Sequence, residues 1–141
     1  MMRIALAAAL CAGVALHAAA PADAQTYPTR PIKVVVPFPP GGPTDGLARI
    51  ISDRLGAVLG QPIVVENRGG AGGGLGGKFV AEAEPDGYTI LMSPGGALTT
   101  GPIVNPNIGY DPVKVFAPVA QLIETPIIVE VSPELPVHSM A

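Results

Sequence analysis

A short apolar run followed by a helical repeat is the clearest pattern in the chain. Ile32 to Val36 is apolar except for Lys33 and rich in β-branched side chains, which favours a strand covered on both faces. From Asp45 onward, apolar side chains recur at the spacing of one helical face, with charged residues on the other side. Gly60 and Pro62 then predict the end of the helix. The apolar positions are Leu47, Ile50, Ile51, Leu55, Val58 and Leu59, and the charged ones are Arg49, Asp53 and Arg54.

The alternation of strands and helices continues along the chain. Ile63 to Val65 predicts a second strand, Lys78 to Glu84 a short helix, and Tyr88 to Met92 a third strand after a turn at Pro85-Asp86-Gly87. This order predicts an α/β fold with a mostly parallel sheet and right-handed crossovers. Two further strands are predicted at Val115 to Ile123 and at Ile127 to Val131, separated by Pro126.

The first two dozen residues have the layout of a secretory signal peptide. Arg3 precedes an apolar stretch from Ile4 to Ala20, and Ala22-Asp23-Ala24 fits a small-x-small cleavage site. We therefore expect residues 1–24 to be removed during export to the periplasm. An uncleaved anchor is the alternative, but the apolar stretch is shorter than the roughly 20 residues of a spanning helix.

Catalytic and metal chemistry has little support in the residues that would remain. The only cysteine, Cys11, lies in the apolar leader, which leaves no disulfide, thiol nucleophile or cysteine ligand in the mature chain. Cys11 follows Leu10 rather than a small residue, so a lipid anchor is not expected. Ser93 lacks a G-x-S-x-G setting, and His138 is the only histidine outside the leader. We predict no enzyme activity, no metal and no cofactor.

The charge distribution excludes another class of partner. The formal net charge is −3, and the lysines and arginines are scattered singly. Nucleic acids and anionic membrane surfaces require clustered cations, so neither is an expected partner. An apolar fraction of 48% argues against disorder.

The loop between the first strand and the following helix is the main candidate site. It reads Pro37-Phe38-Pro39-Pro40-Gly41-Gly42-Pro43-Thr44-Asp45. Free backbone N–H groups and the positive end of the helix dipole face the crevice at such a junction, where small anions bind in α/β folds. Glycines allow close approach to a ligand, and Thr44 adds a hydroxyl. Because Pro43 has no N–H, the expected donors are Gly42, Thr44, Asp45 and Gly46.

A purely structural interpretation of this loop stays open. A rigid turn whose Thr44 or Asp45 only caps the helix explains the same residue types. The carboxylate of Asp45 also competes with an anion for the positive helix end. If Asp45 touches a solute, we expect it to meet a hydroxyl, an ammonium group or a bridging water.

Two glycine-rich segments raise further candidates. Ser93-Pro94-Gly95-Gly96 follows the third strand and is expected at the same edge of the sheet, although a turn that satisfies its own hydrogen bonds is the alternative. Gly72 to Lys78 matches two nucleotide-binding patterns. Phe79 stands where a phosphate loop needs Ser or Thr, and an exported protein meets little nucleotide, so we assign no nucleotide site there.

Five motifs in one order resemble a known receptor family. They are the loop at Pro37–Asp45, Val65-Glu66-Asn67-Arg68, the glycines from Gly69 to Gly77, Pro85-Asp86-Gly87-Tyr88-Thr89 and Tyr110-Asp111-Pro112-Val113-Lys114. The chain resembles the Bug receptors, TctC-like extracytoplasmic solute-binding components of tripartite tricarboxylate transporters. Gly69 and Gly74 stand where the family usually has Pro and Asn, which predicts a looser backbone.

The resemblance implies a fold, a ligand and partners. It implies a periplasmic-binding-protein-like lobe of type 2, incomplete in this chain, in a monomer that delivers a small carboxylate to membrane permease subunits. Residues 25–141 would form part of the N-terminal lobe, and the second lobe, which holds the other half of a pincer on the carboxylate, would be absent. A truncated remnant that binds nothing is the alternative. The expected ligand contacts are Phe38, Gly41, Gly42, Pro43, Thr44, Asp45, Ser93, Gly95 and Gly96.

Two other features are expected to be structural. The segment at Tyr110–Lys114 resembles the family's approach to a fourth strand, with Phe116 as a core anchor. Glu66 and Arg68 are expected to pair at the end of the second strand, and an exposed pair of this kind contributes only about 0 to 1 kcal/mol.

Overall fold

A computed structural model describes residues 26–126, 128, 130–132 and 134–135. The predicted signal peptide lies outside these residues. None of the helices within them has the length and apolar character needed to cross a membrane. The elements are β1 (Ile32–Val36), α2 (Pro43–Leu59), β2 (Ile63–Asn67), η1 (Ala71–Gly73), α3 (Gly74–Ala81), β3 (Thr89–Leu91), α4 (Gly95–Leu98), α5 (Thr100–Val104), η2 (Pro106–Ile108) and α6 (Pro112–Val115).

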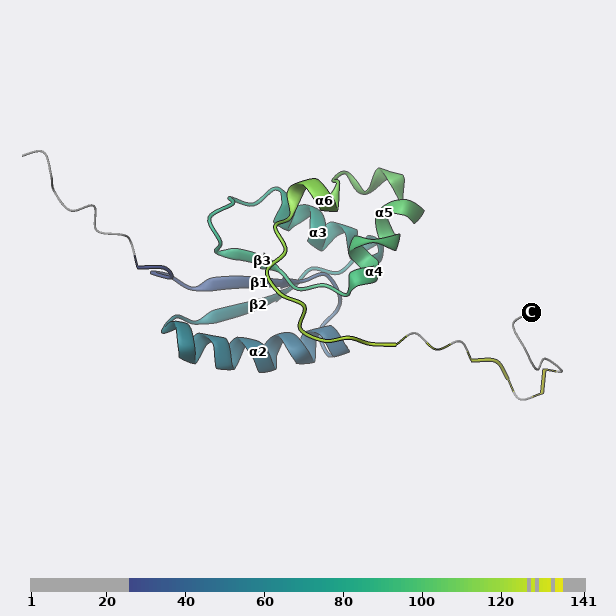
Figure 1. Cartoon of the computed structure of the whole chain (residues 1–141), viewed down its shortest axis with the longest axis horizontal. Coiled ribbons are helices and arrows are strands. Elements are labelled where there is room, and N and C mark those ends of the chain that lie inside the picture. The colour runs from purple at the N-terminus through teal and green to yellow at the C-terminus, as the bar shows by residue number, and fades with distance from the viewer. Residues whose placement is uncertain (1–25, 127, 129, 133, 136–141) are drawn as a thin grey trace, which may run out of the picture.

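The sheet is parallel and three-stranded, in the order β2-β1-β3 (Figure 1). Val34 of β1 lies opposite Val65 of β2 on one side and Ile90 of β3 on the other. Val35 and Val36 are fully buried, as expected for an apolar central strand with cover on both faces. The predicted α/β class and the three strands are confirmed.

Helices cover both faces of the sheet. Helix α2 packs on β1 and β2, and α3 packs on β1 and β3 from the other side, where α4, α5 and α6 also lie (Figure 1). The core on the α2 side is built around Val34, Val36 and Ala48. The half-buried side chains packed against it are Phe38, Ile63, Val65, Ile90 and Met92.

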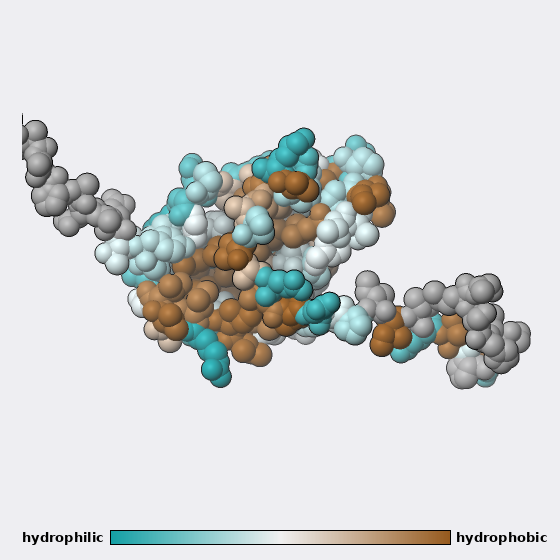
Figure 2. Space-filling view, in the orientation of Figure 1, coloured by the Kyte–Doolittle hydropathy of each residue, from teal (hydrophilic) through white to brown (hydrophobic). Residues whose placement is uncertain are grey.

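Helix α2 has the predicted end but a different buried face. Pro43 occupies its first turn, and Gly60 closes it in a left-handed conformation with its N–H donating to the Gly56 carbonyl at 2.9 Å. Its fully buried positions are Asp45, Ala48 and Ser52. The predicted apolar face is only partly covered, since Ile50 is 63% and Val58 82% exposed, and Figure 2 shows hydrophobic side chains on the surface along this helix. Small residues face the sheet because they let the helix approach it closely.

The second part of the glycine run, from Gly74 to Gly77, forms the start of a helix rather than a loop. Helix α3 begins at Gly74, not at Lys78 as predicted, and ends at Ala81 rather than at Glu84. Gly76 and Gly77 are buried. A Cβ atom added to Gly76 would lie 2.7 Å from Pro37 Cβ and 2.8 Å from the Arg68 carbonyl oxygen. The absence of side chains lets α3 touch the loops after β1 and β2, and this contact outweighs the poor helix propensity of glycine.

The predicted strand from Val115 to Ile123 is wrong. Asp111 instead caps helix α6, accepting a hydrogen bond from the Val113 N–H at 3.1 Å, with Pro112 in the first turn. The stretch 116–126 contains no strand. Phe116 is half-buried and meets Tyr110 edge to face, with ring centroids 5.6 Å apart, outside the central core. Local capping decides the structure here because β-propensity alone, without a neighbouring strand, forms no ladder.

The second strand predicted in this region is tested only in part. Residues 127 and 129 lie outside the described part of the chain, and Ile128, Glu130 and Val131 are not in a strand.

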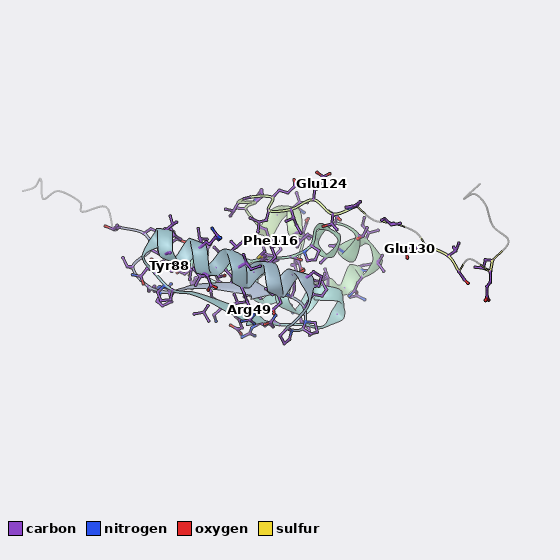
Figure 3. All side chains as sticks on the ribbon, turned by 90° about the horizontal axis from the view of Figure 1, so that it is seen from below. Arg49, Tyr88, Phe116, Glu124 and Glu130 are labelled. Atoms are coloured by element: carbon purple, nitrogen blue, oxygen red, sulfur yellow. The ribbon has the colours of Figure 1, made fainter. Side chains whose placement is uncertain are left out.

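The edge of the sheet where its strands begin is closed by polar and aromatic contacts. Tyr27 Oη donates to the Gly87 carbonyl at 2.7 Å, and Arg30 pairs with Asp86 at 2.6 Å. The Arg30 guanidinium lies 3.9 Å from the centroid of the ring of Tyr88. Tyr88 is labelled in Figure 3. These contacts fix the turn that leads into β3.

Replacing Gly76 by alanine is expected to destabilise the chain by about 1 to 3 kcal/mol, because the new methyl overlaps Pro37 and the Arg68 backbone. Gly46→Ala in α2 is the matched control, since a Cβ there meets nothing within 4 Å. We expect it to stabilise the chain by about 0.5 to 1 kcal/mol. Urea unfolding followed by circular dichroism measures both, and equal effects of the two substitutions would contradict the close packing of α3.

Candidate functional site

Three loops meet at the edge of the sheet where the parallel strands end. They follow β1, β2 and β3. Gly73 marks their meeting point, because a Cβ there would lie 3.3 Å from Ala97 Cβ and 3.4 Å from Phe38 Cζ. The two segments predicted to carry ligand contacts therefore lie close together, on either side of Gly73.

The first loop presents backbone donors at the start of α2. Gly41 has a positive φ of 88° and Gly42 is the N-cap, so the chain turns sharply into the helix. Pro43 has no N–H, and among the described residues the N–H groups of Gly42, Thr44 and Asp45 have no internal acceptor. The Gly46 N–H donates to the Gly42 carbonyl at 3.0 Å, so the expectation that Gly46 supplies a donor is wrong.

The Asp45 side chain is occupied by internal hydrogen-bond partners. It is 4% exposed and accepts hydrogen bonds through both oxygens. Oδ2 accepts from the Gly41 N–H at 2.9 Å and from Arg49 Nε at 3.1 Å. Oδ1 accepts from Arg49 Nη2 at 3.0 Å and from Asn67 Nδ2 at 3.0 Å. The carboxylate thus holds the loop, and it does not cap α2, whose N-cap has no side-chain hydrogen bond.

The same contacts shift the acidity of Asp45. Hydrogen bonds from Arg49, then from the Gly41 amide and from Asn67, lower the pKa of Asp45 from 3.8 to about 2. Asp45 is therefore ionised throughout the physiological range.

Asn67 has a role that the sequence did not reveal. Its Nδ2 donates both to the Phe38 carbonyl at 3.1 Å and to Asp45, and its Oδ1 accepts from Arg49 Nη2 at 3.3 Å. Asn67 is the last residue of β2, and a polar residue at the end of a strand next to the loop was the available signal. The expected pair of Glu66 and Arg68 forms at 2.5 Å and is joined by Lys33, 2.9 Å from Glu66.

The second loop follows β3 and begins helix α4. Ser93 is half-buried, and its hydroxyl donates to the Pro94 carbonyl at 3.2 Å, so the turn partly satisfies itself. Gly95 and Gly96 are exposed. Their carbonyls accept from the hydroxyls of Thr99 and Thr100 at 3.0 and 2.8 Å, and in the described part of the chain their N–H groups have no internal acceptor.

Helix α3 is not built as a phosphate cradle. Gly73 N–H and Leu75 N–H both donate to the Gly70 carbonyl, and Lys78 lies 3.8 Å from Glu82. The Arg68 guanidinium covers the Phe79 ring at 3.6 Å. Within the described residues, no three His, Cys, Asp or Glu side chains gather as metal ligands.

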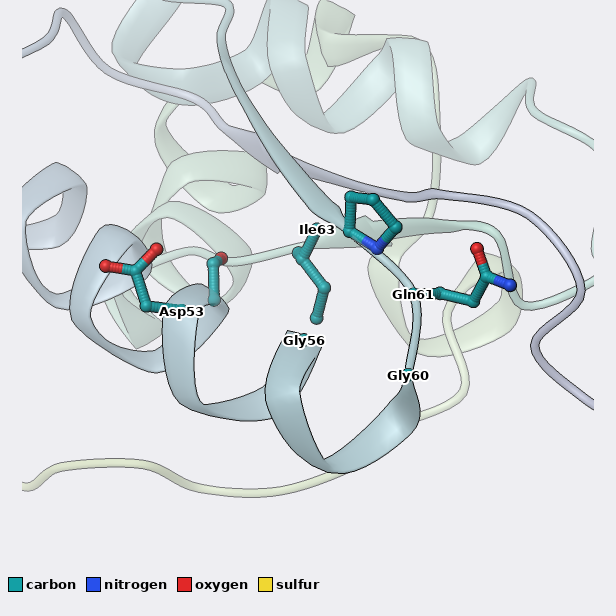
Figure 4. A pocket seen from close by; sticks show the side chains of 7 residues that line it. Asp53, Gly56, Gly60, Gln61 and Ile63 are labelled. Atoms are coloured by element: carbon teal, nitrogen blue, oxygen red, sulfur yellow. The ribbon is translucent and has the colours of Figure 1, made fainter.

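A separate hollow lies away from the three loops. It is an open depression of about 410 Å³ between the end of α2 and the start of β2 (Figure 4). Its lining includes Ser52, Asp53, Gly56, Gln61 and Ile63. Because it lies where β2 begins, at the opposite edge of the sheet from the three loops, it is not part of the candidate site.

Comparison with known proteins places the chain in a family. Residues 47–141 match the family model TctC, described as tripartite tricarboxylate transporter family receptor. The chain belongs to this family. It is 44% identical over 123 residues to the protein BugT of Bordetella pertussis, a match that covers 86% of this chain and 38% of BugT.

Solved structures agree with this fold. MatC (Rpa3494) from Rhodopseudomonas palustris with bound malate is 45% identical, with a TM-score of 0.63 over 66% of this chain and 32% of MatC. R. palustris Rpa4515 with adipate is 42% identical, with a TM-score of 0.59 over 62% of this chain and 29% of that one. The fold is that of periplasmic binding proteins, and the chain spans well under half the length of these relatives.

The lowered pKa of Asp45 predicts a specific acid sensitivity. The pKa is lower in the folded state than in the unfolded one, so the ionised carboxylate stabilises the fold above about pH 4, and this contribution is lost as the pH falls towards about 2. We expect Asp45→Asn to be less stable than the parent at pH 6, with the difference shrinking between pH 5 and pH 2.5. Urea midpoints across this range measure it, and a constant difference would contradict the assignment.

Proposed function

We propose that the chain supplies part of the first lobe of a solute-binding receptor that captures a small carboxylate. The observation that carries this proposal is the set of backbone N–H groups at Gly42, Thr44 and Asp45 that have no internal acceptor among the described residues, near the loop that begins α4. Membership of the TctC family supports it. Two similar proteins are known with malate and with adipate.

Binding would use neutral donors and the helix dipole rather than a free cation. A carboxylate at the start of α2 would accept hydrogen bonds from these backbone N–H groups and from the Thr44 hydroxyl. The Gly95 and Gly96 amides would donate to the same solute, and the Ser93 hydroxyl would do so by turning its proton from the Pro94 carbonyl to the carboxylate. Phe38 would pack its ring against the solute's carbon chain, with Gly41 and Pro43 shaping the loop. No bond is made or broken, so the chain would be a receptor and not an enzyme.

Affinity would depend on a second lobe. Two or three charge-assisted hydrogen bonds contribute about 1.5 to 3 kcal/mol each before the entropy of association is subtracted. Micromolar binding requires about 8 kcal/mol net. We therefore propose that residues 25–141 alone bind at millimolar strength and that closure of two lobes provides the rest.

The setting of this receptor follows from the family. We propose that residues 1–24 direct export, that the mature protein acts as a monomer in the periplasm, and that it delivers its solute to the membrane subunits of a tripartite tricarboxylate-type transporter. The leader-like sequence and the family of the chain support this proposal.

Titration with malate, adipate, acetate and citrate tests the proposal. In amide NMR spectra of the chain, we expect the resonances of Gly42, Thr44 and Asp45 to shift, with dissociation constants in the millimolar range. Gly42→Leu is expected to weaken binding by about tenfold or more, since a Cβ at Gly42 fits 3.8 Å from the Pro39 carbonyl and a longer side chain would cover the donors.

A leucine placed elsewhere on α2 is the control. Ala57→Leu places the same leucine side chain at an exposed position of α2, remote from the loop, and should leave binding unchanged. No shift at the three amides with any of the four carboxylates would overturn the proposed site.

A further inference from the structure

The loop after β1 is held by one buried carboxylate that gathers three segments. Asp45 receives hydrogen bonds from Gly41 in the loop, from Arg49 one turn further along α2, and from Asn67 at the end of β2. Asn67 also holds the Phe38 carbonyl. Side chains therefore hold both ends of the segment 38–41.

The backbone N–H and the side chain of Asp45 differ in their partners. The Asp45 N–H has no internal acceptor, while its carboxylate is buried and fully occupied. A rotation of this side chain towards the crevice would place a negative charge beside the donors and repel a carboxylate solute. The contacts of Arg49 and Asn67 oppose such a rotation, because it would break their hydrogen bonds to the carboxylate.

Arg49 supplies the compensating charge. Its Nε and Nη2 both reach Asp45, in the bidentate geometry that guanidinium groups form with carboxylates. A lysine carries the same charge but forms no fork, so it would hold the carboxylate less firmly.

We propose that Arg49 and Asn67 are positioning residues of the carboxylate site. They hold the Asp45 carboxylate inward, which fixes the loop at Gly41 and leaves the amides of Gly42, Thr44 and Asp45 free for a solute. Neither side chain needs to touch the solute. The role in binding rests on the proposed function, whereas the effect on the loop does not.

A role in general stability is the competing explanation, and substitutions at Arg49 separate the two. If Arg49 only stabilises the fold, Arg49→Met weakens carboxylate binding no more than its loss of stability explains. If Arg49 neutralises Asp45, Arg49→Met weakens malate and adipate binding by about tenfold. Arg49→Lys then has a smaller effect. The double variant Asp45→Asn with Arg49→Met recovers most of the lost affinity. Arg54→Met removes a cation from the same helix that forms no ion pair among the described residues, and it should bind as the parent does.

Asn67 is tested without any ligand. Asn67→Asp is nearly isosteric but replaces the donor Nδ2 with an oxygen facing Asp45 and the Phe38 carbonyl, and Asn67→Leu removes the donor without adding charge. In both variants we expect hydrogen exchange at the Gly41 amide to accelerate by about tenfold or more, while exchange at Val35 in β1 reports any change in overall stability. The acceleration should be larger for Asn67→Asp.

The outcomes separate this inference from the proposed function. Suppose that exchange at Gly41 is faster in the Asn67 variants but the parent chain binds none of the carboxylates. This result would support the role of Asn67 in holding the loop and overturn the proposed carboxylate capture. Unchanged exchange at Gly41, or equal acceleration at Gly41 and Val35, would overturn the positioning role of Asn67. Failure of the double variant to recover binding would overturn the positioning role of Arg49.

Discussion

The parallel pairing of β1 with both neighbours is the constraint on which the rest of the structure depends. Because β1 is central and apolar, helices must cover both of its faces, and right-handed crossovers place them there. The same topology brings the ends of all three strands to one edge. The order of the elements alone therefore brings together the loops that follow β1 and β3. The candidate site results from that topology.

At this edge of the sheet, two requirements on the loop after β1 conflict. The backbone of Asp45 serves one of them and its side chain serves the other. The carboxylate capture that we propose needs free N–H groups at the start of α2, while a glycine-rich loop needs a partner that fixes its conformation. Asp45 would meet both needs, since its N–H has no internal acceptor among the described residues and its carboxylate binds the Gly41 amide. The negative charge that results is tolerated because Arg49 pairs with it in a bidentate geometry.

The sequence predicted the elements that local patterns determine and missed those that close packing determines. The limits of β1 and the end of α2 at Gly60 follow from an apolar run and a helix stop signal, and both are found in the structure. The start of α3 at Gly74 was missed because the contact of Gly76 with Pro37 is visible only in three dimensions. The contacts of Asn67 were missed for the same reason, since its partners Phe38 and Asp45 lie in a different segment. The strand predicted after Val115 was wrong because apolar, β-branched residues indicate a strand only where a neighbouring strand accepts the pairing.

The buried face of α2 shows why hydrophobic periodicity locates a helix more reliably than it locates the core. A helix that lies close to a sheet needs small side chains at the contact, and Ala48 and Ser52 occupy that position here. Large apolar residues on the flanks, such as Ile50 and Val58, are then lifted away from the strands and remain exposed. The close approach also brings the first turn of α2 within hydrogen-bonding distance of Asn67 on β2. The close packing of α2 on the sheet thus has two consequences. Large apolar side chains on the flanks of the helix stay exposed, and the loop at its start is held in place.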